Sequence, residues 1–229
     1  MNVLRNLLVV VCLCLEACGG GGEGDKTQDS HLVRKSIPTF AMGNPGSTVP
    51  ATGMPLYRLT ISADPAGAIE WSKLTFGVTA TKGTMLSNLY LVDHDAPSVN
   101  LLDTTSSQLT TVGSGTASGV ATTLYTITIN LLGNSVQPQY AQIAAGQTKT
   151  YDLYGTVSGF STGSTLTIAL SPDTSPVTSA SAAVIAANPI AGNVVWSDRS
   201  SAVHTITSSD WTNGYGLKDF TNAIGYSKQ

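Results

Sequence analysis

The 229-residue chain (23.6 kDa) carries a formal net charge of −3, and only 11% of its residues are charged. This length is enough for one domain with a sizeable core. The lack of a basic surplus excludes the usual electrostatic footprint of a nucleic-acid-binding protein, and 41% hydrophobic residues exclude a disordered chain. Thr, Ser and Gly are the most frequent residues, with 30, 25 and 23 copies. Because Thr favours strands whereas Gly and Ser favour turns, this composition predicts an all-β protein.

The chain begins with the features of a targeting segment. A short polar start containing Arg5 precedes the apolar run Leu7–Leu15, which is too short to span a bilayer and has the length of a signal-peptide hydrophobic region. The sequence Leu15-Glu16-Ala17-Cys18 follows and resembles the lipobox of a bacterial lipoprotein. The resemblance implies cleavage before Cys18 and a diacylglyceryl group on its sulfur. Glu16 departs from the small or apolar residue usual at that position.

The cysteines agree with this interpretation. Cys12 and Cys14 are removed with a signal peptide of residues 1–17, and lipid occupies the sulfur of Cys18, so no thiol remains for a disulfide, a metal site or a nucleophile. Residues 18–35 are rich in Gly and polar residues, which predicts a flexible tether. The alternative is an ordinary secretory signal that leaves Cys18 as a free thiol.

From Ser36 onward, apolar residues alternate with polar ones, the pattern of half-buried strands. The phase of the alternation shifts at Ser72-Lys73, which predicts a β-bulge. Residues 86–92 are apolar at both parities, which predicts a central strand. The residues expected in the core are Leu59, Ile61, Trp71, Leu74, Phe76, Tyr125, Ile127, Ile129, Leu153, Ile168 and Trp196.

The spacing of these segments predicts an immunoglobulin-like Greek-key β-sandwich of about nine to eleven strands over residues 36–200, behind the flexible N-terminal tether. Residues 201–229 are expected to form a C-terminal segment that packs on the sandwich. The aromatic residues of this segment and the turn pair Asn213-Gly214 motivate that expectation, because large exposed aromatic side chains on a secreted surface need a partner.

Five stretches carry a resemblance to a known kind of domain, and they are residues 56–64, 69–76, 143–159, 195–198 and 209–215. They resemble a β-sandwich module of bacterial cell-surface and envelope proteins that is common in uncultivated bacteria with small genomes. The resemblance covers roughly residues 36–229 and implies a structural role at the cell surface. It brings no known catalytic residues with it.

Two motifs with possible chemistry have simpler interpretations. Gly159-Phe160-Ser161-Thr162-Gly163 matches G-x-S-x-G, but a nucleophile elbow needs a following helix and the next segment alternates as a strand, so a hairpin turn is expected. Asp93 and Asp95 flank His94 and are the candidate ligands for a structural Ca²⁺, the only cofactor considered. The alternative for these residues is a solvated turn, and three widely separated His residues offer no Zn²⁺ site.

Trp211 and Tyr215 are the candidate ligand-binding residues. Exposed aromatic rings stack on sugars, and both residues lie in a segment without strand periodicity. The alternative is that they pack the C-terminal segment against the sandwich.

Three functions follow from these features. The first is a non-catalytic, lipid-anchored bacterial cell-surface protein with a structural or adhesive role, attached to the cell envelope through Cys18 and exposed at the outer surface or secreted. Its partners would be the membrane, copies of itself or other surface proteins, and not nucleic acid. The second is a subunit of a surface filament or array in which Ser36–Phe40 completes a neighbour's sheet by strand addition. The third is a polysaccharide-binding module. No enzyme is expected, because no nucleophile, acid pair or metal cluster stands out.

Overall fold

The computed structural model describes residues 34–47, 49–51, 53–101, 107–117, 120–131, 140–177, 192–217 and 222–227. The predicted signal peptide, Cys18 and the predicted tether up to residue 33 therefore lie outside the described residues.

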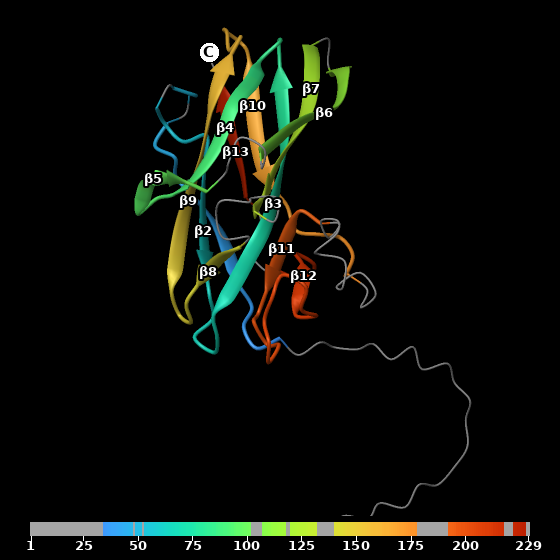
Figure 1. Ribbon diagram of the computed structural model, residues 1–229. Coiled ribbons are helices and arrows are strands. Elements are labelled where there is room, and N and C mark those ends of the chain that lie inside the picture. The colour runs from blue at the N-terminus through green and yellow to red at the C-terminus, as the bar shows by residue number, and fades with distance from the viewer. Residues whose placement is uncertain are drawn as a thin grey trace, which may run out of the picture. The chain divides into compact units, whose positions relative to one another are not determined.

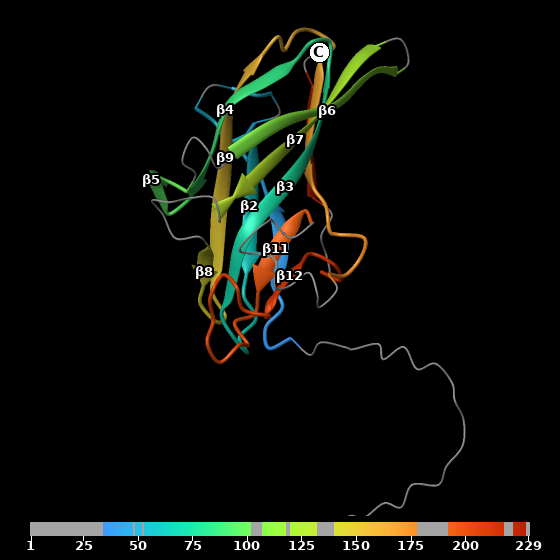
Figure 2. The same cartoon turned by 45° about the vertical axis from the view of Figure 1, so that its right-hand side comes forward.

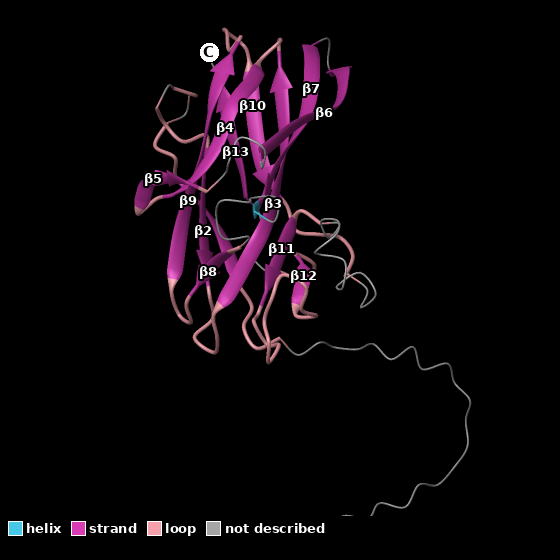
Figure 3. Cartoon of the chain, viewed as in Figure 1, coloured by secondary structure: helices cyan, strands magenta, loops and turns pink. Residues whose placement is uncertain are grey.

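The described residues form two antiparallel sheets and contain no α-helix (Figures 1 and 3). Sheet A has five strands in the order β1 (Thr39–Gly43), β2 (Tyr57–Ser62), β9 (Thr148–Ser158), β4 (Met85–Asp93) and β5 (Ala96–Asn100). Sheet B has eight strands, of which the main path is β12 (Trp211–Asn213), β11 (Val194–Ser197), β3 (Ile69–Thr81), β10 (Thr165–Leu170) and β13 (Asn222–Ser227). The other three are β7 (Val120–Asn130) and β8 (Ala141–Ile143), which pair with β3, and β6 (Ser107–Ala117), which pairs with β7 (Figure 2).

The long strand β3 organises sheet B because it pairs with four other strands. One edge pairs with β8 at residues 69–71 and with β7 at residues 73–81, and the other edge pairs with β11 and then with β10. Trp196 lies opposite Trp71 and Val195 lies opposite Lys73, so Ser72 is an extra residue in β3. This bulge lies at the predicted phase shift. Because of it, Trp71 before the bulge and Leu74 after it both point into the core.

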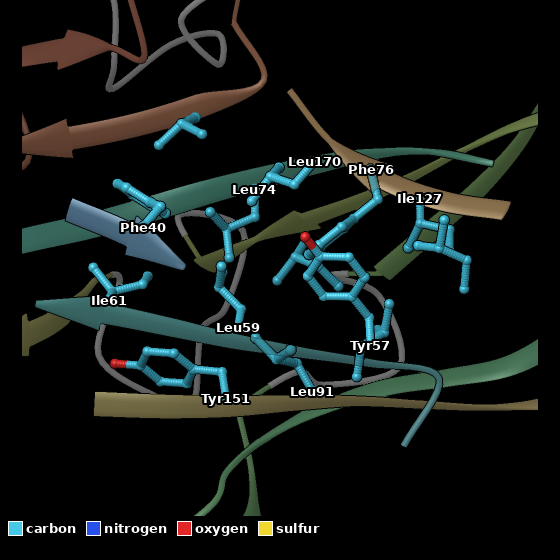
Figure 4. Close-up of a cluster of buried hydrophobic side chains, with 14 of the residues drawn as sticks. Phe40, Tyr57, Leu59, Ile61, Leu74, Phe76, Leu91, Ile127, Tyr151 and Leu170 are labelled. Carbon is cyan, nitrogen blue, oxygen red and sulfur yellow. The ribbon is translucent and has the colours of Figure 1, made fainter. Parts of the chain in front are cut away.

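The core lies between the two sheets and is built from the alternating rows that the sequence predicts. In β2, for example, Tyr57, Leu59 and Ile61 are at most 1% exposed. Aromatic rings meet edge to face across the sheets, with Tyr57 and Phe76 at 5.2 Å between centroids (Figure 4). All the expected core residues are buried except Tyr125, which is partly buried and packs against the core. The all-β sandwich is thereby confirmed.

Three details differ from the expectations. Strand β4 is not a central strand along its length, because β5 covers only its end at Val92 and Asp93, and Met85 and Tyr90 are exposed. The segment Gly159–Gly163 joins β9 in sheet A to β10 in sheet B, so it is a connection between sheets rather than a hairpin turn. The described residues contain thirteen strands, because three-residue strands such as β8 and β12 are too short to show an alternation.

The C-terminal segment contributes strands to sheet B. Strand β12 lies beside β11, and β13 lies beside β10, with Leu166 opposite Tyr226. Residues 203–207 contain no strand, and Val203 is 75% exposed. The segment is thus part of the sandwich and not only packed on it.

Candidate functional site

The two aromatic residues singled out from the sequence occupy different environments. Trp211 is 1% exposed and packs with Val195 on the outer side of sheet B, and its indole nitrogen donates to the carbonyl of Thr205 at 2.8 Å. Tyr215 is 52% exposed. The two rings therefore do not form one open platform, and the enclosed ring of Trp211 has the environment of a packing residue.

One of the two candidate Ca²⁺ ligands, Asp93, is occupied by protein groups. Asp93 Oδ2 lies 2.8 Å from the ammonium group of Lys149, and Asp93 Oδ1 accepts the backbone N–H of Asp95 at 3.0 Å. Asp95 is exposed in the turn. Within the described part of the chain, no three His, Cys, Asp or Glu side chains come close enough to hold a metal ion together.

A buried charged cluster lies at the end of the sandwich where the described chain begins. The Nδ1 atom of His204 lies 2.8 Å from Asp210 Oδ2, and its Nε2 atom contacts Glu70 Oε2. Arg199 Nε is 3.1 Å from the other oxygen of Glu70. Burial on its own raises the pKa of Asp210, but hydrogen bonds from Ser208, the Ser201 backbone and His204 outweigh it, and the net pKa lies below its ordinary value.

This cluster has a superficial likeness to a catalytic arrangement, since Ser208 Oγ lies 3.2 Å from His204 Nδ1. However, the Ser208 hydroxyl contacts Asp210 Oδ1 and lies 2.7 Å from the carbonyl of Thr205. Both imidazole nitrogens face carboxylates, so the ring is held between Asp210 and Glu70. The Ser208 hydroxyl is engaged by Asp210 and Thr205 in the same way, so the geometry favours a structural role.

The same end of the sandwich holds the first described residues. The backbone N–H of Lys35 donates to Asp198 Oδ2 at 2.8 Å, and Arg34 donates to the carbonyl of Asp210 at 2.8 Å. The Arg34 guanidinium also lies 5.7 Å from the ring centroid of Trp196. These contacts fasten the chain where it enters the domain.

The outer face of sheet A presents hydroxyl groups and a partly buried ion pair. Thr60 and Ser62 of β2 face Thr150 and Thr148 of β9 with hydroxyl oxygens 3.3 and 2.8 Å apart. Next to them, Arg58 forms two hydrogen bonds to Asp152, and His94 Nδ1 lies 2.7 Å from the same carboxylate.

A shallow depression of about 200 Å³ lies farther along the same face. Its floor contains the rings of Tyr90 in β4 and Tyr154 in β9, stacked with 5.1 Å between centroids and 9° between planes. Asn88 and Thr156 line it beside the rings, and Pro50 belongs to the loop on its other side. Sequence reasoning did not single out this pair, although both tyrosines lie in strands predicted from the pattern.

Comparisons with known proteins add no family to this description. Neither a family model nor a curated protein matches the chain. The described part of the chain contains no helix that is long and apolar enough to cross a membrane.

Proposed function

We propose that this protein is a non-catalytic, lipid-anchored protein of a bacterial cell surface, and that its β-sandwich is displayed in an adhesive or structural role. The lipid is attached to Cys18, and the tether ends before Arg34, because Arg34 and Lys35, which were expected within it, are bound to the domain. The proposal combines the lipobox-like sequence with the way in which the described domain begins.

The observation that carries the proposal is the fastening of Arg34 and Lys35. A displayed domain transmits force through the residues that follow its tether. Here Arg34 is bound to the carbonyl of Asp210 and Lys35 to the carboxylate of Asp198, and both partners lie far along the chain. The ion pair between Arg34 and Asp198, at 3.7 Å, has side chains that are 12% and 0% exposed, so solvent screens it little. A force applied to the tether is therefore transmitted to Asp198, which directly follows β11, and to Asp210, which directly precedes β12.

The place where the described chain begins also supports display. Strand β3 (Ile69–Thr81) extends from the charged cluster near Arg34, which contains Glu70, to the turn at residues 82–84 at the other end of the sandwich (Figure 1). The described chain therefore begins at one end of the sandwich. The outer face of sheet A is the surface that would meet a partner, because it carries hydroxyl groups beside the ion pair of Arg58 and Asp152.

The filament alternative has less support. Strand β1, which contains the expected donor residues Thr39 and Phe40, pairs with β2 of its own chain, and Phe40 is 2% exposed in the core. Strand addition to a neighbour would have to break this pairing and expose Phe40.

The proposal is tested by changing Cys18→Ser and fractionating cells that express the full chain. The wild-type protein is expected in the membrane fraction, with an N-terminal peptide whose mass includes the lipid on Cys18, and the variant is expected in the soluble fraction. Ser30→Ala, a change within the tether, is the matched control and should stay with the membrane. Membrane retention of the Cys18→Ser protein, or a wild-type N-terminus at any other residue, contradicts the proposal.

A further inference from the structure

The strongest unassigned feature of the molecule is the stacked pair Tyr90 and Tyr154. The two rings lie on the outer, solvent-facing side of sheet A, with Tyr90 38% exposed, and they are not part of the hydrophobic core. Tyrosine combines an apolar ring face with a hydroxyl group, and such rings are typical of surfaces that bind amphipathic ligands.

A β-bulge builds the depression around these rings. Ser87 lies opposite Thr156 and Tyr90 lies opposite Tyr154, so Asn88 and Leu89 together face the single residue Gly155. Asn88 has a φ of +50°, a conformation that is uncommon for residues other than glycine. Bulges and strained residues of this kind concentrate at functional sites, where they redirect a side chain.

Gly155 is required at the bulge because space is short there. A Cβ atom on Gly155 would lie 2.7 Å from Cδ2 of Leu89 and 3.0 Å from Cδ1 of Leu56. Without that atom, Leu89 packs inward, and the preceding residue, Asn88, places its amide on the outer face, where it donates to Thr156 Oγ1 at 3.3 Å.

The chemistry of the depression selects the class of ligand. Its described lining contains two aromatic rings, an amide and a hydroxyl, and no charged side chain. Amide and hydroxyl groups both donate and accept hydrogen bonds, which matches the hydroxyl groups of a sugar. The volume of about 200 Å³ is below the roughly 300–1,000 Å³ of typical small-molecule sites, so it accommodates about one sugar ring.

We propose that this depression binds one ring of a neutral saccharide, which stacks on the free face of Tyr90, the more exposed ring of the pair, and forms hydrogen bonds with Asn88 and Thr156. This inference rests on the proposed adhesive function and names its ligand class. It moves the aromatic sugar site expected at Trp211 and Tyr215 to the outer face of sheet A, because Trp211 is enclosed and Tyr215 is not paired with it.

The test measures binding of the detergent-solubilised full-length protein to mannan, laminarin, dextran and xylan on beads. At least one of these polysaccharides should deplete the wild-type protein from solution. Tyr90→Ala should then raise the Kd by about tenfold, the factor that corresponds to about 1.4 kcal/mol of stacking. Asn88→Gly keeps the positive φ accessible and removes the amide, so it should also weaken binding. Tyr215→Ala, which removes another exposed tyrosine, is the matched control and should leave the Kd within about twofold.

Thermal melting shows whether each variant is folded. If Tyr90→Ala is unstable, Tyr90→Phe, which keeps the aromatic ring, is measured as the second variant. The proposal is overturned when none of the four polysaccharides depletes the wild-type protein, when Tyr90→Ala binds as tightly as the wild type, or when Tyr215→Ala loses binding instead. Because the described lining is neutral, a strong loss of binding with added salt would also contradict it. Solubilised protein is used so that these outcomes do not depend on the lipid at Cys18.

Discussion

The hydroxyl of Tyr226 in β13 donates a 2.7 Å hydrogen bond to the backbone carbonyl of Leu56, which directly precedes β2. Both residues are nearly fully buried, at 2% and 1% exposed. The bond therefore links the C-terminal strand of sheet B to the beginning of β2 in sheet A through the core. Together with the pairing of β13 with β10, it holds β13 in the fold.

Replacing Tyr226 with Phe keeps the ring and removes this donor. We expect the free energy of unfolding to fall by about 1–3 kcal/mol, because a buried polar group loses its partner. Urea unfolding measures the loss. Tyr215→Phe, at an exposed position, should change stability by less than about 0.5 kcal/mol. Equal effects of the two variants would show that the bond contributes nothing to stability.

Alkaline pH should destabilise the protein through its buried tyrosines. Burial raises the pKa of Tyr226 and Tyr151 to about 12 and that of Tyr57 further. Since an unfolded tyrosine has a pKa of about 10, the contribution of these groups is fully present below about pH 10 and is lost as the pH rises through about 12. The urea midpoint should fall over this range together with the appearance of tyrosinate absorbance. Tyrosinate formation from all tyrosines before any unfolding would contradict the prediction.

Asp152 should make the protein sensitive to acid. Burial alone raises its pKa, but the hydrogen bonds from Arg58 and His94 outweigh burial, and the net pKa lies below its ordinary value. The carboxylate therefore stabilises the fold above about pH 4, the usual pKa of Asp, and this stabilisation is lost as the pH falls through the lowered value.

Asp152→Asn should lower the free energy of unfolding near neutral pH by about 1–3 kcal/mol and flatten its dependence on pH in the acid range. Unfolding curves at several pH values measure both effects. Asp95→Asn, at an exposed turn residue, is the control. A variant that retains the acid sensitivity of the wild type would show that other carboxylates determine it.

Trp211 should behave as a core residue despite its position near the C-terminus. It is 1% exposed and contacts Val195, Tyr140 and His204. Trp211→Ala should cost about 3–5 kcal/mol of stability through the cavity it leaves. Thermal or urea unfolding tests this value, with Tyr215→Ala as the exposed control. A loss below about 1 kcal/mol would mean that Trp211 is not held in the environment described.

For long alternating strands such as β2 and β3, the amino-acid pattern alone predicts the strand and the side chains that face the core. Alternation in residues 57–61 and the phase shift at Ser72 are local properties, because side chains of a strand alternate between faces wherever the strand lies. Leu59, Ile61 and Ile127 are therefore found in the core as predicted. The lipobox-like sequence that ends at Cys18 is also a local feature of the chain, because identifying it requires no tertiary contact.

Contacts between residues far apart in the chain depend on the folded arrangement of the strands. The stacking of Tyr90 on Tyr154 depends on the register between β4 and β9 and on the extra residue in the bulge. The contacts of His204 with Glu70 and Asp210 depend on how the loops bring the strands back to the same end of the sandwich. Periodicity identifies the face on which a side chain lies but not its neighbour across the sheet, because register follows from packing of the whole core. For the same reason, the sequence does not distinguish ligand binding from packing at Trp211. Its segment has only three strand residues, so its burial is determined by contacts with β11 and the surrounding loops rather than by a local pattern.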